Sequence, residues 1–491
     1  MFTDESRRTV SDQLRQRDLR AFQHLLRPEV FTQASKQAGV RLGNSALSRV
    51  NMVWLGIASA FHGALDFASV LSLTLKLLED SPTWSSTPEA AARRTAQRRR
   101  KRRPKRSTRI SKHDPHGSDP TQVSEEAFVK ARRRMPLGFW VALLLILSDR
   151  FEQDHGQWAR WKKFRLLALD GTTVSLPNWQ KLAEGFGVAK NGKGKGRVQT
   201  RMVMLQLPLV RLPWRYDLSP VAEGERTVAR RLLGQVRPDD LVLMDKGFWS
   251  YGLFWQIQNQ QAFFAIRLFR SVRLQTLRRL GPKDRLVRWR PSGRQWHTGE
   301  WPKDITLRVM DYQIPGFRKS ALVTNMLDPR AITRDEWLRL ATTEAGKVVE
   351  PGLYHRRWEI ETTFRELKVQ QGMEGNLRGR TPEAIRFEVA GHVLLYFLVR
   401  WLMVEAAEEA GLEDPLRLSF THALRELQQM TPNLIQATPQ RAAQVLLPRL
   451  LKRIASHQVP LRPGRHYPRP HDTKIRINGK GKVMRPSKLA A

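Results

Sequence analysis

Cysteine is absent from the 491-residue sequence. Its absence excludes disulfide bonds and zinc sites built on thiolates, and it is compatible with a reducing cytoplasm. The first residues do not form a basic region followed by an apolar one, so we expect no secretory signal peptide. The 12 histidines show no grouping typical of a zinc site.

Long hydrophobic runs without charge are also lacking. The apolar run at 137–147 is too short to span a bilayer, and the run at 389–404 contains His392 and Arg400. We therefore interpret both runs as buried helices and expect no membrane association.

Acidic residues are few beside the basic ones. The chain has 46 Asp and Glu against 85 Lys and Arg, which gives a net charge of +39 and a pI near 11.3. Such an excess repels itself in a compact fold unless a polyanion lies nearby, and phosphates are the natural partners of Lys and Arg. A solvated basic surface or a ribosome-associated protein has the same composition. The charge predicts nucleic-acid binding and says nothing about catalysis.

The basic residues are most concentrated in the proline-rich segment 81–122. Such a segment cannot bury a core, so we expect it to be disordered until it meets phosphate. It can be interpreted as a nuclear-localisation patch, but we favour a flexible DNA-gripping arm. The residues expected to contact DNA here are Arg98, Arg99, Arg100, Lys101, Arg102 and Arg103.

A second basic segment, 190–197, alternates Lys and Gly. It resembles a phosphate cradle, yet its glycines do not follow a strand and open a helix, as a P-loop requires. We interpret it as a basic hairpin in which Lys193 and Lys195 contact the DNA backbone.

Alternating strand and helix patterns between 164 and 268 predict a mixed α/β sheet. Short strands separated by Gly and Pro follow up to about 330 and indicate a β-rich insertion. Long helices are then expected at 348–370, 382–410 and 415–430.

Two acids occupy similar places in the α/β region. Asp170 and Asp245 each end a short apolar strand, and glycine follows within two residues. Ligands gather beyond the carboxyl ends of strands in open α/β sheets, and paired carboxylates there suit Mg²⁺. The alternative is that each Asp simply belongs to a turn.

A third acid is selected by helical projection. At about 100° per residue, Tyr354, Arg357, Glu361 and Lys368 fall in one stripe about 60° wide. Glu359 projects about 140° from Tyr354, well outside this stripe. An ordinary solvated helix with ion pairs is the alternative interpretation.

These residues together resemble the DDE transposases of the insertion sequence four family. Tyr354, Arg357, Glu361 and Lys368 have the spacing of that family's tyrosine–arginine–glutamate–lysine motif. The segments 169–172 and 244–248 resemble its first and second acid motifs, with Lys246 where many relatives carry Arg. The resemblance is clear over about 164–406 and weak elsewhere.

The resemblance implies a ribonuclease-H-like mixed sheet flanked by helices and interrupted by a β-rich insertion, with helical N- and C-terminal regions. It also implies that Asp170, Asp245 and Glu361 bind two Mg²⁺ (or Mn²⁺) ions for DNA strand cleavage and strand transfer. The alternatives are a non-catalytic or domesticated DNA-binding descendant, and a ribonuclease-H-like nuclease without joining activity. The implied partner is double-stranded DNA, both element ends and target, bound by a homodimer in the bacterial cytoplasm or nucleoid.

Four further residues are expected at the DNA. Arg357 and Lys368 are placed to contact phosphates, although Arg357 can instead pair with Glu361. Tyr354 suits phosphate contact better than a nucleophilic role. Relatives can stack an insertion-domain tryptophan on a flipped base, and Trp289 is a candidate for this role, with ordinary packing as the alternative.

We divide the chain into seven regions on these grounds. They are a helical, DNA-binding region at 1–80, a basic linker at 81–122, a helical connection at 123–160, the first part of the core at 161–268, the β-rich insertion at 269–345, the second part of the core with the glutamate helix at 346–410, and C-terminal helices with a basic tail at 411–491.

Deletion of residues 93–106 is expected to weaken DNA binding for every sequence. Fewer counterions are then released on binding, so the slope of log affinity against log salt should flatten by roughly 0.9 for each phosphate that the arm no longer neutralises. Affinities measured at several salt concentrations check this. An unchanged slope would show that the arm does not touch phosphate.

Overall fold

The described part of the chain excludes the basic segment 81–122 and most of the basic segment 190–197. The computed structural model describes residues 20–43, 47–63, 123–189, 196–269, 271–291, 301–313, 319–339, 342–344, 347–349, 352–436, 441–460, 476–477 and 483–484. The arm residues Arg98 to Arg103 and the hairpin residues Lys193 and Lys195 therefore lie outside it.

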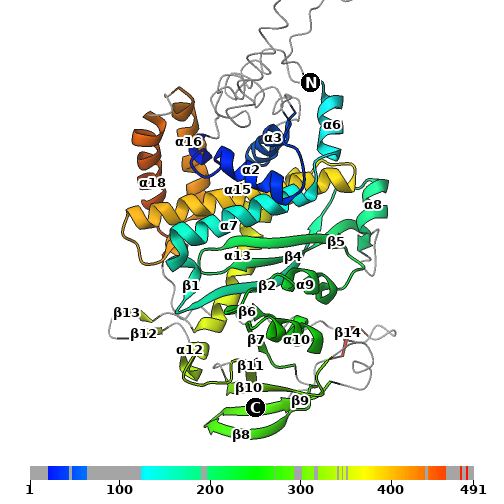
Figure 1. Ribbon diagram of the computed structural model, residues 1–491, viewed down its shortest axis with the longest axis vertical. Helices are drawn as coiled ribbons and strands as arrows, with labels where there is room; N and C mark the ends of the chain where they lie inside the picture. The colour runs from blue at the N-terminus through cyan, green and yellow to red at the C-terminus, as the bar shows by residue number, and fades with distance from the viewer. Residues whose placement is uncertain are drawn as a thin grey trace, which may run out of the picture.

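An eleven-stranded mixed sheet forms the centre of the molecule (Figure 1). Five strands make up its core in the order β5-β4-β2-β6-β7, with β5, β4 and β2 antiparallel and β2, β6 and β7 parallel. This arrangement confirms the predicted ribonuclease-H-like class. The core strands are β2 (Phe164–Ser175), β4 (Arg197–Leu207), β5 (Leu212–Pro220), β6 (Asp240–Met244) and β7 (Phe263–Arg267).

The four strands after the core extend the same sheet. β11 pairs antiparallel with β7, and β10, β9 and β8 follow in turn. The insertion therefore continues the core without a break in hydrogen bonding, and it occupies the end of the molecule opposite the long helices (Figure 1). Its strands are β8 (Gln275–Gly281), β9 (Asp284–Trp289), β10 (Ile305–Tyr312) and β11 (Ser320–Thr324).

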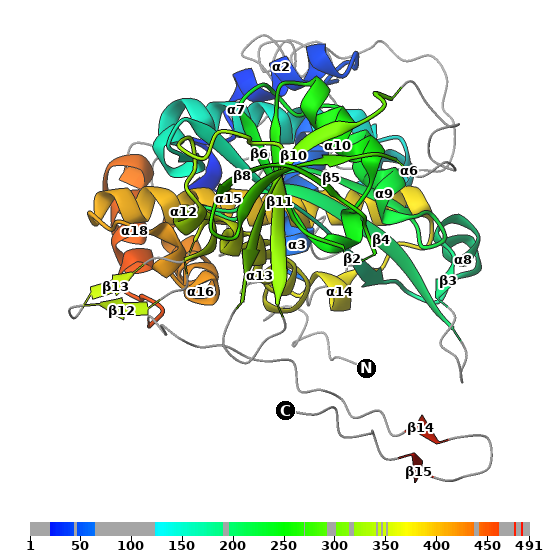
Figure 2. The ribbon, with the colours of Figure 1, turned by 90° about the horizontal axis from the view of Figure 1, so that it is seen from below.

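Both faces of the core sheet are buried, as the near-continuous apolar strands require. Leu241 and Leu243 of β6 belong to one hydrophobic cluster, and Val242 and Met244 belong to the other. The first cluster includes α12, and the second includes α9 and α10, which lie across the sheet from α12 (Figure 2). These helices are α9 (Glu225–Leu233), α10 (Tyr251–Asn259) and α12 (Arg334–Leu338).

The register between β2 and β6 is held by a buried ion pair. Arg165 and Asp240 are direct partners in the parallel ladder, and the guanidinium donates from Nε and Nη2 to the two carboxylate oxygens, each at 2.6 Å. Glu152 of α7 (Leu137–Ala159) accepts a third hydrogen bond from Arg165 at 2.7 Å. Two parallel hydrogen bonds fix the relative orientation of the two side chains and also pair their charges.

A helical layer covers the β5 end of the sheet. α15 (Pro382–Glu409) and α7 (Leu137–Ala159) both pack on β5, and α3 (Arg49–Phe61) packs along α15 (Figure 1). α3 and α15 approach closely at Gly391, where a Cβ atom would lie 2.4 Å from the carbonyl oxygen of Gly56. Glycine is needed there because no side chain fits between the backbones.

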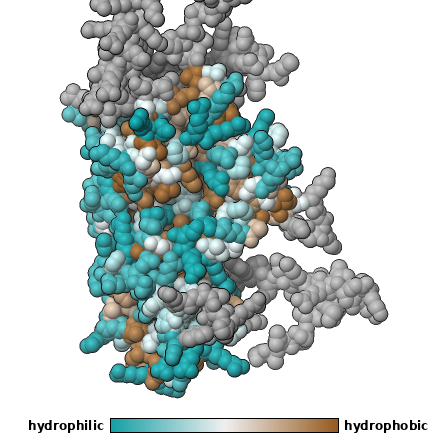
Figure 3. Space-filling view, turned by 45° about the vertical axis from the view of Figure 1, so that its right-hand side comes forward, coloured by the Kyte–Doolittle hydropathy of each residue, from teal (hydrophilic) through white to brown (hydrophobic). Residues whose placement is uncertain are grey.

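α15 is the only helix among the described residues that is long and apolar enough to cross a membrane, and its apolar window is entirely buried. It is therefore a core helix. Its neighbours bury it on every side, and they include α6 (Glu125–Arg133), α16 (Phe420–Gln436) and α18 (Leu447–Ala455). On the face shown in Figure 3, most of the described surface is hydrophilic, with smaller hydrophobic areas among it.

The remaining elements are short. They are η1 (Arg20–Phe22), α2 (Pro28–Gln37), β1 (Arg160–Trp161), α8 (Gln180–Phe186), β3 (Val188–Ala189), η3 (Lys246–Phe248), β12 (Thr342–Glu344), β13 (Lys347–Val349), α14 (Met373–Asn376), η6 (Pro415–Arg417), η7 (Ala442–Leu446), β14 (Arg476–Ile477) and β15 (Val483–Met484), together with the glutamate segment described below.

Trp289 lies in the hydrophobic core, which favours the alternative of ordinary packing over stacking on a DNA base. Its ring is 6% exposed and lies 5.1 Å from Trp249, 5.1 Å from Tyr251 and 5.4 Å from Phe254, between centroids. These rings join β9 to α10 and leave no open face for a base. Side chains alternate between the two faces of a strand, and in β9 this alternation points Trp289 into the core.

Trp289→Ala should lower the free energy of unfolding by about 3–5 kcal/mol, because it leaves a cavity among buried rings. Urea unfolding followed by circular dichroism measures the change. Leu277→Ala is a suitable control, since Leu277 lies on the exposed strand β8. Weakened DNA binding by a Trp289 variant of undiminished stability would contradict this role.

Candidate active site

The parallel ladder brings two of the three predicted acids side by side. The last β2–β6 pair is Leu169 opposite Met244, and the next residues along each strand are Asp170 and Asp245. Side chains alternate between the faces of a sheet, so both acids fall on the face of Leu243. This is the face that the glutamate segment covers.

Asp170 lies inside its strand, so the prediction that it ends the strand is wrong. β2 continues to Ser175, and its antiparallel partner β4 pairs with Gly171 and beyond, where β6 has already ended. Gly171, the next residue of the strand, lies close to a neighbouring side chain. A Cβ atom there would lie 3.1 Å from the carboxylate of Glu225, at the start of α9.

The segment carrying the third acid contains three kinds of helix. Residues Leu353–Trp358 form the 3₁₀ helix η4, Glu359–Arg365 the α-helix α13 and Glu366–Gln370 the π-helix η5. The prediction of one α-helix from 348 to 370 is wrong, since 347–349 is strand β13. With three residues per turn in η4, Tyr354 and Arg357 lie above one another.

Arg357 lies between two of the acids. Its Nη1 is 3.8 Å from Asp170 Oδ2 and 3.4 Å from Glu361 Oε1, and its side chain is only 5% exposed. Its guanidinium also lies 4.4 Å from the ring centre of Trp358. The predicted pairing with Glu361 is therefore present, and Arg357 acts as the counter-ion of the site.

The three acids interact electrostatically. Burial raises the pKa of Asp170 to about 6, while the Gly171 N–H and the Arg357 guanidinium act to lower it and the carboxylates of Glu361 and Asp245 raise it further. The Gly171 N–H donates to Asp170 Oδ1 at 2.8 Å. Additional negative charge is therefore disfavoured at this place, and a cation is favoured.

Tyr354 ties the glutamate segment to the sheet. Its hydroxyl donates to the carbonyl of Met244 at 3.0 Å and accepts from the N–H of Arg267 at 3.2 Å. Burial raises the pKa of this phenol, which makes it a poor nucleophile. Through Met244, Tyr354 contacts the backbone just before Asp245, and its contact with phosphate stays a prediction.

Lys368 contacts the far end of β2. Its Nζ donates to the carbonyl of Thr173 at 2.7 Å and lies 3.5 Å from a carboxylate oxygen of Glu374. Glu374 in turn accepts the N–H of Ser175 at 2.7 Å. Glu374 was missed by sequence reasoning, because its partner lies 199 residues away and no local pattern marks it.

The donor set fits a hard divalent cation, because carboxylate oxygens are the ligands that such ions prefer. In the part of the chain that the structure describes, no three acidic or histidine side chains are already gathered into a closed metal site. Arg357 lies between Asp170 and Glu361 instead, and the Glu361 side chain is 42% exposed. Asp170, Asp245 and Glu361 are the residues that could hold the ions.

Asp170→Asn should stabilise the metal-free protein at pH 7. An acid whose pKa rises on folding, from 3.8 to about 6, stabilises the fold when protonated, and this contribution is lost as the pH rises through that interval. The gain expected at pH 7 is about 1–3 kcal/mol. Thermal unfolding between pH 4 and pH 7 tests this, with the difference vanishing at low pH. Glu126→Gln, on the surface, is the control.

Known proteins similar to this chain are transposases. A family described as "Transposase DDE domain" matches residues 161–398. The chain is 28% identical over 322 residues to "Transposase InsG for insertion sequence element IS4" of Escherichia coli (strain K12), a match that covers 63% of this chain and 68% of that protein.

Among solved structures, the chain is similar to a piggyBac transposase in a synaptic complex with hairpin DNA, with 10% identity and a TM-score of 0.30. The match covers 66% of this chain and 63% of the other, less than two thirds of its length. The family match spans both strand acids and the glutamate segment, and the sheet order agrees with it. Over residues 161–398 the chain is thus similar to the DDE domain of transposases, and it resembles those of the insertion sequence four family.

Proposed function

We propose that this transposase binds the ends of its element as double-stranded DNA and moves the element by strand cleavage and strand transfer. The observation that supports this most directly is the alignment of Asp170 with Asp245 across the parallel ladder, with Glu361 joined to Asp170 through Arg357. Residues far apart in the sequence thus meet at one edge of the sheet.

Asp170, Asp245 and Glu361 are proposed to hold two Mg²⁺ or Mn²⁺ ions. When bound, such ions supply activation of water or a 3′-hydroxyl and stabilisation of the leaving oxygen at phosphorus. The raised pKa of Asp170 favours this role, because a cation relieves the repulsion among the three carboxylates.

The chain's own residues orient the DNA. Arg357 and Lys368 are proposed to exchange their present oxygen partners for phosphate oxygens of the element end. Arg357 offers a planar fork and Lys368 a point charge. Tyr354 holds Asp245 in place through Met244. Because its buried phenol is a poor nucleophile, the proposed chemistry uses no covalent link between protein and DNA.

The assembly is proposed to be a homodimer on DNA, acting in the bacterial cytoplasm or nucleoid without a membrane partner. The net charge of +39 supports an extended DNA interface, to which the arm at 98–103 and the hairpin residues Lys193 and Lys195 contribute.

Asp170→Asn should reduce Mg²⁺-dependent nicking of element-end DNA by more than about 100-fold. Loss of a residue that orients a metal ligand costs about 10–100-fold, and loss of the ligand itself should cost more. DNA affinity should change little. Nicking of labelled DNA and a binding titration measure the two effects, with Glu126→Gln as the control. Undiminished nicking by the Asp170 variant would rule out the proposed site.

Transfer of labelled 3′ ends into target DNA separates a transposase from a nuclease. Cleavage without transfer favours a ribonuclease-H-like nuclease, and binding without cleavage favours a non-catalytic descendant.

A further inference from the structure

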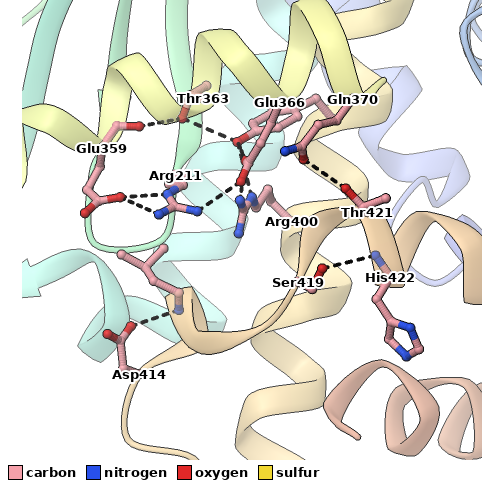
Figure 4. A network of polar contacts seen from close by, with 12 residues as sticks. Arg211, Glu359, Thr363, Glu366, Gln370, Arg400, Asp414, Ser419, Thr421 and His422 are labelled. Carbon is pink, nitrogen blue, oxygen red and sulfur yellow. Dashed lines mark hydrogen bonds and ion pairs between the residues drawn. The ribbon is translucent and has the colours of Figure 1, made fainter. Parts of the chain in front are cut away.

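A buried polar network lies behind the helical segment that carries Glu361 (Figure 4). Arg211, in the turn between β4 and β5, reaches two glutamates of that segment. Its Nε and Nη2 lie 2.7 and 2.6 Å from Glu359 Oε2, and its Nη1 lies 3.0 Å from Glu366 Oε1. One guanidinium thus joins the sheet to two points of the segment.

Glu366 is held from a second side by α15. Arg400 pairs with its other carboxylate oxygen, and the hydroxyl of Tyr396 donates to the same oxygen at 2.7 Å. Burial acts to raise the pKa of Glu366, but the guanidinium groups of Arg400 and Arg211 bring it below its ordinary value. The carboxylate therefore stays charged, and both arginines are needed to balance the two glutamates.

The network contacts the side of the segment opposite Glu361. Glu359 is the first residue of α13, and Glu366 is the first residue of η5. At about 100° per residue they project within about 20° of each other, and Glu361 projects at least about 140° from either. The buried pair thus sets the rotation of the segment, while Glu361 remains partly exposed on its other side.

The backbone of Arg211 has a φ of +54°, in the left-handed region that residues with a Cβ rarely adopt. Glycine forms such a turn without strain, but it has no side chain to reach the helix. The residue that adopts this uncommon backbone conformation is thus the one whose guanidinium contacts both glutamates.

We infer that Arg211 is a positioning residue for the carboxylate of Glu361, an inference that rests on the proposed function. Without Arg211, Glu359 and Glu366 lose a buried counter-ion, and the segment is free to rotate or move outward. Glu361 then loses its position beside Arg357 and Asp170. Residues that orient metal ligands typically change metal affinity or activity by about 10–100-fold.

Arg211→Ala in the full chain is expected to weaken Mn²⁺ binding about tenfold, as measured by electron paramagnetic resonance of the free ion. The Mg²⁺ concentration for half-maximal cleavage should rise by a similar factor. DNA affinity without metal should be unchanged. Arg211→Lys keeps the charge but cannot span both carboxylates, so its Mn²⁺ affinity should lie between those of wild type and Arg211→Ala.

Arg308→Ala is the matched control. Arg308 is fully buried, compared with 14% side-chain exposure for Arg211, and it also donates from Nε and Nη2 to a carboxylate, that of Asp284, but it belongs to the insertion strand β10. Its loss should lower stability and leave Mn²⁺ affinity unchanged. Equal Mn²⁺ affinity in wild type and Arg211→Ala, or an equal loss in Arg308→Ala, overturns the inference.

If Arg211→Ala does not fold, Arg211→Lys carries the same comparison. A wild-type chain that binds Mn²⁺ no better than Asp170→Asn does would instead disprove the proposed metal site, and the inference would fall with it.

Discussion

The ion pair between Arg165 and Asp240 fixes the register on which the site depends. These residues are partners at one end of the β2–β6 ladder, and Asp170 and Asp245 follow five positions later on both strands. A slip of one residue moves every side chain of a strand to the other face. Such a slip would separate the two carboxylates, so a contact at one end of the ladder decides the chemistry at the other.

Contacts on two sides position the glutamate segment against the end of the β2–β6 ladder. On the front, Tyr354 and Arg357 of the 3₁₀ turn contact Met244 and Asp170. On the back, Arg211 holds the segment through the network described above. The change from 3₁₀ through α to π geometry lets a short stretch satisfy contacts that a uniform helix cannot meet together, and π-turns are frequent where function requires an unusual geometry.

The mixed sheet could be predicted from the sequence, because strand texture is a local signal, and local patterns also nominated the three acids, whose role stays a prediction. The contacts of Tyr354, Trp289 and Arg211 could not. The projection assumed α-helical winding, whereas η4 is a 3₁₀ helix, and Trp289 is inward because of its place in β9. The partners of Arg211 lie 148 and 155 residues away, beyond any local pattern.

The position of α15 also affects how the protein can be divided. This helix contacts α3 from the N-terminal region, β5 from the catalytic core and α18 from the C-terminal region. The matched family region ends at residue 398, within α15. A fragment cut at that point would expose the apolar interior of the helix to water and invite aggregation. Excision of the core as a separate module is therefore incompatible with this architecture, and truncations must keep α15 and its partners whole.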